Sequence, residues 1–165
     1  MAIYVDATPL YDLGHIGELE LLAAFDNDLV IPQQVIDEIT VEPAATNLQR
    51  LLEEQSVETD PDIEGWIDDA KRLLDTTTVT SDAVLVACLL AARDSGQEAV
   101  FVSDDRRLRA VADGLGATVT GTFGLTVRAS IDDKYFSVTQ AKRVIRRIDH
   151  HGVQMTGTLR ERAIG

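Results

Sequence analysis

The sequence predicts an α/β fold, a three-layer α/β/α sandwich in which helices flank a central, mainly parallel sheet. Two observations predict it. Short apolar runs, as expected for buried parallel strands, alternate with longer stretches in which apolar residues recur at helical spacing. Residues 99–120 also read as a strand, a helix and a strand in succession, which implies parallel pairing. With 165 residues, 45% of them hydrophobic, we expect a single domain over 1–165 with a helical tail from about 137 to 165.

The first half of the chain alternates strand-like and helix-like segments. In chain order we expect a strand near Ile3 (2–5), a helical stretch opening at 8–9, a helix at 18–25, a strand near Val30 (29–31) and helices at 33–39, 44–54 and 63–74. Pro32 suits the first turn of the helix that follows it, because that position needs no backbone N–H. The polar segment 56–64 is the best loop candidate, with room for a short strand at Val57.

The second half continues the alternation. In chain order we expect a helix at 82–93, a strand near Val100 (99–103), a helix at 106–115, a strand near Val119 (117–120) and helices at 123–131, 138–148 and 156–163. Thr80 or Ser81 can cap the first of these helices, with an acid in its first turn. Because that helix is apolar nearly all round, it is expected to be central. Gly96 and Gly116 suit the ends of two helices.

Charge sets the first limit on function. The chain has 28 acidic and 15 basic residues and a net charge of −13, which at first argues against a nucleic-acid partner. However, only three of the bases are lysine. High acid with little lysine is typical of a protein adapted to concentrated salt, where the Debye length falls to about 3 Å. Repulsion between RNA and distant surface acids is then largely screened, so a nucleic-acid partner remains compatible with this halophilic-type acidic surface.

The expected location is the cytoplasm. No apolar run is long enough to cross a bilayer, so we expect no membrane contact, and no basic region precedes the first apolar run as in a signal peptide. Cys88 is the single cysteine, so it cannot form an internal disulfide. A reducing compartment fits this composition.

Four acids fall at points where predicted elements begin or end. Asp6 and Asp105 follow predicted strands, Glu38 lies in the segment opened by Pro32, and Asp82 starts the long apolar helix. Residues just past the C-terminal ends of parallel strands converge on one crevice. Carboxylates gathered there repel each other unless a cation neutralises them. The pattern therefore suggests a divalent metal site and, through it, hydrolysis of a phosphodiester.

Each acid also has a plainer interpretation. Surface acids are plentiful here, Asp82 could simply stabilise a helix start, and Asp105 could be an N-cap. Asp6 is harder to explain in that way, because an unpaired acid directly after a buried strand costs several kcal/mol when it is dry. We therefore weight the functional interpretation of the whole constellation above the structural one.

Four segments resemble the motifs of PIN domains, in the same order and at similar spacing. They are Ile3–Leu10, Ile31–Ile39, Ser81–Ala87 and Val102–Leu108. The resemblance covers the chain from Ile3 to about Gly124. It implies a metal-dependent endoribonuclease, a hydrolase whose products carry a 5′-phosphate and a 3′-hydroxyl.

The resemblance also implies roles for individual residues. Its catalytic and metal-binding acids map onto Asp6, Glu38, Asp82 and Asp105, which would bind Mg²⁺ or Mn²⁺. Thr8 and Ser103 would support these acids through hydrogen bonds. Asp104 is an alternative metal ligand beside Asp105, but Asp105 is preferred because it follows Ser103 by two positions. Arg106, Arg107 and Arg109 could bind RNA phosphates, and ion pairing with surface acids explains these three arginines equally well.

The resemblance implies several partners: RNA as substrate, a second copy of the chain in a homodimer, and an antitoxin if the protein is a toxin nuclease. A housekeeping RNA-processing role fits equally well. The alternative is a catalytically silent PIN-like module that acts through RNA or protein partners. A haloacid-dehalogenase-like phosphatase is weaker, because that motif has a second acid where this chain has Thr8.

Overall fold

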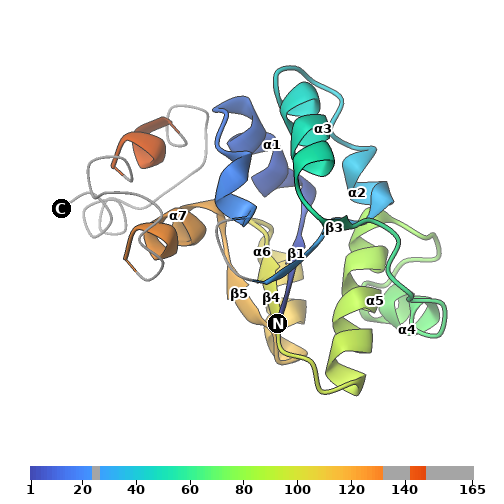
Figure 1. Cartoon of the computed structure of the whole chain (residues 1–165). Helices are drawn as coiled ribbons and strands as arrows, with labels where there is room; N and C mark the ends of the chain where they lie inside the picture. The colour runs from blue at the N-terminus through green and yellow to red at the C-terminus, as the bar shows by residue number, and fades with distance from the viewer. Residues whose placement is uncertain (24–26, 132–141, 148–165) are drawn as a thin grey trace.

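The apolar runs form one parallel sheet, which confirms the predicted α/β/α architecture. The computed structural model describes residues 1–23, 27–131 and 142–147 (Figure 1). Within these residues the strand order is β3-β2-β1-β4-β5, and every neighbouring pair is parallel. The strands are β1 (Ala2–Val5), β2 (Asp28–Val30), β3 (Val57–Glu58), β4 (Ala99–Val102) and β5 (Thr118–Thr120).

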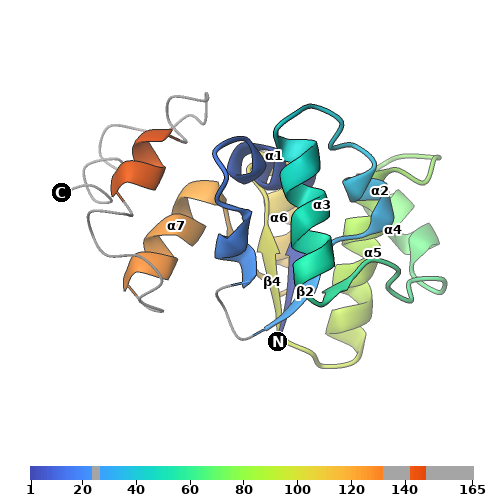
Figure 2. The same cartoon turned by 45° about the horizontal axis from the view of Figure 1, so that its top comes forward.

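Helices cover both faces of the sheet (Figures 1 and 2). α1 and α3 pack together over one face, and α5 packs against α4 and α6 over the other. The elements are α1 (Ala7–His15), the 3-10 helix η1 (Leu19–Ala23), α2 (Gln33–Ile36), α3 (Ala44–Glu54), α4 (Ile67–Leu73), α5 (Ser81–Asp94), α6 (Arg106–Gly114) and α7 (Thr122–Ile131). None of the described helices is long and apolar enough to cross a bilayer.

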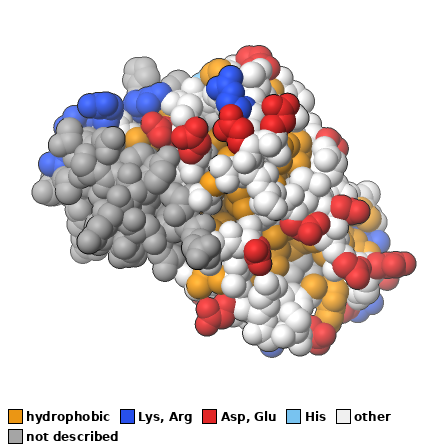
Figure 3. Space-filling view, in the orientation of Figure 1, with side chains coloured by type: hydrophobic (Ala, Val, Ile, Leu, Met, Phe, Trp, Pro, Cys, Tyr) orange, Lys and Arg blue, Asp and Glu red, His pale blue; other side chains and the backbone are white. Residues whose placement is uncertain are grey.

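The central strands are buried on both faces, as their continuous apolar runs predict. All four residues of β1 are buried, and Phe101 of β4 is fully buried at the middle of the sheet. α5 is buried along most of its length, as its apolar composition predicts. Most acidic side chains lie at the surface, and they are scattered over the described part of the face in Figure 3.

Several predicted helices are shorter or tighter than expected. The segment predicted as a helix at 18–25 is a 3-10 helix over Leu19–Ala23. α2 ends at Ile36, because the chain tightens into three-residue turns, in which the Glu38 and Ile39 amides bond to the carbonyls of Val35 and Ile36. α4 begins at Ile67 instead of residue 63. In the tail, residues 142–147 are helical, and the helix predicted at 156–163 lies outside the described residues.

Gly14 allows α1 and α3 to approach closely. A Cβ at this position would lie 3.0 Å from both the Cα and the Cβ of Ala44. The side-chain amide nitrogen of Asn47 also donates a hydrogen bond to the Gly14 carbonyl oxygen at 2.7 Å. We expect Gly14→Ala to lower the free energy of unfolding by about 1–3 kcal/mol, because the added methyl overpacks this contact. Urea unfolding measures this change.

Gly114→Ala is the matched control, because a Cβ at Gly114 meets no atom within 4 Å. This second change should be neutral or slightly stabilising, since alanine favours the helix. Equal destabilisation by both substitutions would contradict the close contact as the cause.

Candidate active site

Asp6 lies at the end of β1, where the strand gives way to α1. It is the N-cap of α1, and its Oδ1 accepts a hydrogen bond from the Ala7 amide at 2.8 Å. Its Oδ2 accepts one from the Ser103 hydroxyl, also at 2.8 Å. The side chain is only 6% exposed. Burial raises the pKa of Asp6, these two hydrogen bonds oppose the rise, and the charges of Asp105 and Glu38 add to it.

Ser103 joins the first and fourth acids. β1 and β4 are register partners up to Val5 and Val102, so the residues that follow them lie side by side. The fully buried Ser103 hydroxyl donates to Asp6 and accepts from the Asp105 amide at 3.1 Å. Asp105 is exposed and caps α6, its Oδ1 accepting from the Leu108 amide at 3.0 Å. The Ser103 hydroxyl thus links Asp6 to the backbone of Asp105, whereas the side chain of Thr8 is exposed and forms no hydrogen bond with a described residue.

Glu38 and Asp82 approach the same place from two other elements. The Ser81 hydroxyl at the start of α5 donates to Glu38 Oε1 at 2.9 Å. The Thr80 hydroxyl caps α5 by accepting from the Ala83 amide at 3.1 Å, which places Asp82 in the first turn. Burial raises the pKa of Asp82, and the charges of Asp6, Asp105 and Glu38 raise it further. The charges of Glu38 and Asp105 thus act on both Asp6 and Asp82.

Asp104 points to a different partner. Its two carboxylate oxygens accept from the amide and the hydroxyl of Thr122, at 3.0 and 2.7 Å. Gly121 packs so tightly on this carboxylate that a Cβ there would lie 2.5 Å from Asp104 Oδ1. Asp104 therefore fixes the start of α7, and of the two neighbouring acids it is Asp105 that faces Asp6 and Asp82.

A cavity of about 190 Å³ opens beside Asp82 and Asp105. Arg107 also lines it and donates a hydrogen bond to the Leu74 carbonyl oxygen. The positive charge of Arg107 opposes the rise in the pKa of Asp82. Arg106 and Arg109, on the same helix, are exposed. Of the three arginines proposed for RNA binding, Arg107 is the one that lines this cavity.

Comparison of the sequence with protein-family models shows to which family of α/β proteins the chain belongs. The family DUF3368, described as a PIN domain, matches residues 2–165. This chain belongs to the PIN domain family. Searches among curated proteins and among solved structures found no match. PIN domains are generally nucleases and typically use divalent metals.

The four acids of this PIN domain offer the type of ligand atom that a hard divalent cation prefers, but their side chains are not arranged as a metal site. Asp6, Glu38, Asp82 and Asp105 offer only carboxylate oxygens, the donors that Mg²⁺ and Mn²⁺ prefer. Among the described residues, no group of three or more His, Cys, Asp or Glu side chains lies close enough together to hold a metal ion. A cation shared by these acids therefore requires side-chain rotation, which is easiest at the exposed Glu38 and Asp105.

Sequence reasoning missed Asp12, a buried acid on α1 of this PIN domain. It is 9% exposed, and its pKa rises to about 6, first because of burial and then because of the charge of Asp104, while His15 opposes the rise. The available signal was its position between Leu10 and Leu13, on the buried face of the helix. Asp12 extends the acidic region from the strand ends towards α1.

We expect Asp12→Asn to raise the free energy of unfolding by up to about 3 kcal/mol at neutral pH, because the pKa of Asp12 is raised by about two pH units and each such unit corresponds to about 1.4 kcal/mol. The folded-state pKa of about 6 exceeds the ordinary 3.8, so the wild type loses stability as pH rises between these values. The amide variant has no such loss, and the two proteins should converge below pH 4. Urea unfolding across this range measures the difference, and a difference that grew towards acid pH would contradict the assigned sign.

Proposed function

We propose that this PIN domain is a divalent-metal-dependent endoribonuclease that hydrolyses phosphodiester bonds of RNA. The convergence of Asp6, Glu38, Asp82 and Asp105 from four separate segments carries the proposal. Their repulsion opposes folding of the metal-free chain, so it is unexpected in a purely structural cluster. A cation that binds only the native state would turn this repulsion into attraction.

The four acids would hold Mg²⁺ or Mn²⁺. When bound, the ion would supply positive charge beside the scissile phosphate and lower the pKa of the attacking water. Asp6 is oriented for this task by its hydrogen bonds to Ser103 and Ala7. Glu38 is exposed at the edge of the cluster, where its carboxylate could accept a proton from the attacking water.

Arg107 is the residue best positioned to bind the RNA backbone. It lines the cavity that Asp82 and Asp105 also line, so a phosphate near these acids lies within its reach. A guanidinium can form charge-assisted hydrogen bonds to two phosphate oxygens at once. Arg106 and Arg109 could bind neighbouring phosphates and would fix the strand without reading its sequence.

Cleavage of labelled single-stranded RNA tests the proposal. We expect cleavage with Mn²⁺ or Mg²⁺, none with EDTA, and products carrying a 5′-phosphate and a 3′-hydroxyl. The assay should be run in dilute buffer and in molar KCl, because the acidic surface repels RNA less when salt screens it. Cleavage that persists in EDTA, or RNA left intact by the metal-loaded protein at both salt concentrations, would contradict the proposal.

A catalytically silent binding module is the second candidate, favoured because no group of three or more His, Cys, Asp or Glu side chains in the described residues could hold a metal ion. Calorimetric titration with Mn²⁺ separates the two functions. The nuclease requires Mn²⁺ binding that Asp6→Asn weakens, whereas a silent module that has lost its metal site shows no such binding.

The biological role forms the finer part of the proposal. A toxin nuclease would act on RNA in the cytoplasm and be held inactive by an antitoxin, and the family resemblance also suggests a homodimer. A small open reading frame directly upstream of the gene would favour the toxin over a housekeeping nuclease.

A further inference from the structure

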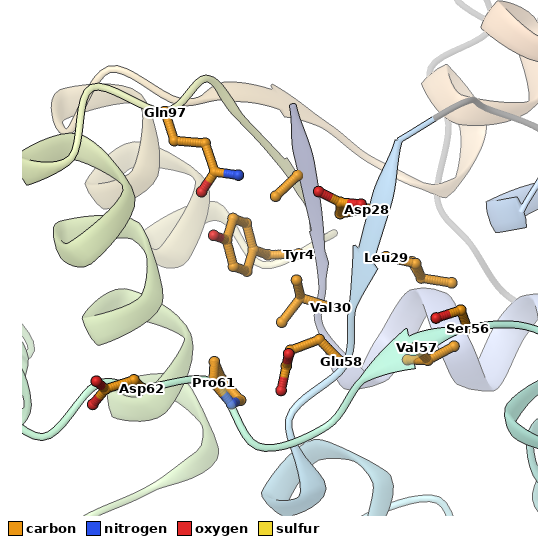
Figure 4. A pocket seen from close by; sticks show the side chains of 11 residues that line it. Tyr4, Asp28, Leu29, Val30, Ser56, Val57, Glu58, Pro61, Asp62 and Gln97 are labelled. Atoms are coloured by element: carbon orange, nitrogen blue, oxygen red, sulfur yellow. The ribbon is translucent and has the colours of Figure 1, made fainter.

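A second cavity lies over the other end of the sheet, where β2 meets the edge strand β3. Its volume is about 420 Å³, within the range of small-molecule sites. It shares no lining residue with the cavity beside Asp82 and Asp105. Figure 4 shows its wall formed by β1, β2 and β3 and by the chain around Pro61 and Gln97.

Its charges are all negative and lie at separate ends. Asp28, Glu58 and Asp62 line the cavity, and no lysine, arginine or histidine does. None of these three acids forms an ion pair with a described residue. In Figure 4, Asp28 and Gln97 lie at one end and Glu58 lies at the other, while Asp62 lies apart from Glu58, beyond Pro61.

The sheet register fixes the separation of two of these acids. Val30 is the register partner of both Tyr4 and Glu58, and Asp28 precedes Val30 by two residues on the same face. Two residues span about 6.6 Å along a strand, and neighbouring strands lie about 4.8 Å apart. The backbone positions of Asp28 and Glu58 are therefore about 8 Å apart. The side chains of Tyr4 and Val30 form the apolar floor between them (Figure 4).

Tyr4 places a hydroxyl group at the cavity. Its side chain is only 6% exposed and lines the cavity. Its hydroxyl makes no hydrogen bond with any described residue, and the hydroxyl oxygen itself is not enclosed, so a ligand in the cavity can reach it. The hydroxyl oxygen can accept a hydrogen bond from a cation, and the ring face can also attract one.

We propose that this cavity binds a linear aliphatic diamine. One ammonium group pairs with Asp28 and the other with Glu58, while the carbon chain lies on Val30 and Tyr4. The pairing is charge-assisted at both ends, and the methylene chain covers apolar surface between them. The site does not depend on the nuclease proposal.

Isothermal titration of the full chain with 1,4-diaminobutane tests the proposal, with butylamine and 1,4-butanediol as matched probes. We expect the diamine to bind at least about tenfold more tightly than butylamine, and no binding of the diol. Asp28→Asn and Glu58→Gln, both at exposed positions, should each weaken diamine binding by a similar factor. Tyr4→Phe should weaken it without loss of the circular-dichroism spectrum.

Glu53→Gln is the matched control, because Glu53 is exposed on α3 and does not line the cavity. Its affinity for the diamine should equal that of the wild type. An equal loss in Glu53→Gln and Glu58→Gln would show diffuse attraction to an acidic protein and overturn the proposal. Absence of diamine binding to the wild type, or equal affinity for the diamine and the monoamine, would overturn it as well.

Discussion

The Asp6→Asn protein is expected to lose RNA cleavage by at least about a hundredfold while folding at least as stably as the wild type. Cleavage falls because the most buried of the four acids no longer carries charge towards a cation. Stability is kept because the amide oxygen can still accept from Ser103 or Ala7, and removing one charge relieves repulsion from Asp105 and Glu38. The rate of RNA cleavage with Mn²⁺ measures the first effect, and urea unfolding in EDTA measures the free energy of unfolding.

Asp37→Asn is the matched control for this result. Asp37 is an exposed acid beside Glu38, and its carboxylate accepts a hydrogen bond from the exposed Gln33 amide. Its removal should leave cleavage within about twofold of the wild type, since surface substitutions away from the site have small effects. Wild-type cleavage by Asp6→Asn would show that the nuclease is a contaminant or that the metal binds elsewhere.

Mn²⁺ is expected to stabilise the wild-type protein strongly. A ligand that binds only the native state adds about 2.7 kcal/mol at a hundred times its dissociation constant. The shift should be largely lost in Asp6→Asn and in Asp82→Asn, because each removes a charge that the cation would neutralise. Urea unfolding with and without Mn²⁺ measures it, and an equal shift in all three proteins would contradict the shared site.

Burial of Asp6 and Asp82, together with repulsion from the neighbouring acids, predicts how the stability of the metal-free protein changes with pH. The folded-state pKa values of Asp6 and Asp82 are raised above the ordinary carboxyl value, chiefly by burial. Stability in EDTA should therefore fall as pH rises from that ordinary value through the raised ones. Saturating Mn²⁺ should remove this loss, since the cation favours the ionised carboxylates.

Most of the fold can be predicted from the sequence, because local residue patterns show where many of the strands and helices begin and end. β1 is a continuous apolar run, and α3 is bounded by Pro43 and the polar residues after Glu54, so both have the bounds predicted for them. η1 and α4 are less well marked. Their apolar spacing extends beyond the segments that form intrahelical hydrogen bonds, so the predicted helices are too long.

The neighbouring positions of Asp6 and Asp105 also follow from the sequence, because both come after parallel strands that end at one edge of the sheet. The resemblance to PIN domains predicts that Ser103 supports these acids, but no local pattern shows which of them it contacts. The bond from Ser103 to Asp6 depends on the register of β1 with β4, and 97 residues separate the two side chains. The hydrogen bonds that Asp104 accepts depend on Thr122, which lies 18 residues after Asp104. Such long-range pairings leave no local pattern.

The most direct test of a shared metal site is the anomalous scattering of manganese in crystals grown with Mn²⁺. The account predicts a peak in contact with Asp6 and at least one of Glu38, Asp82 and Asp105, with their side chains rotated inwards. A peak at Asp28 and Glu58 alone, or no ordered manganese in crystals of active protein, would contradict it.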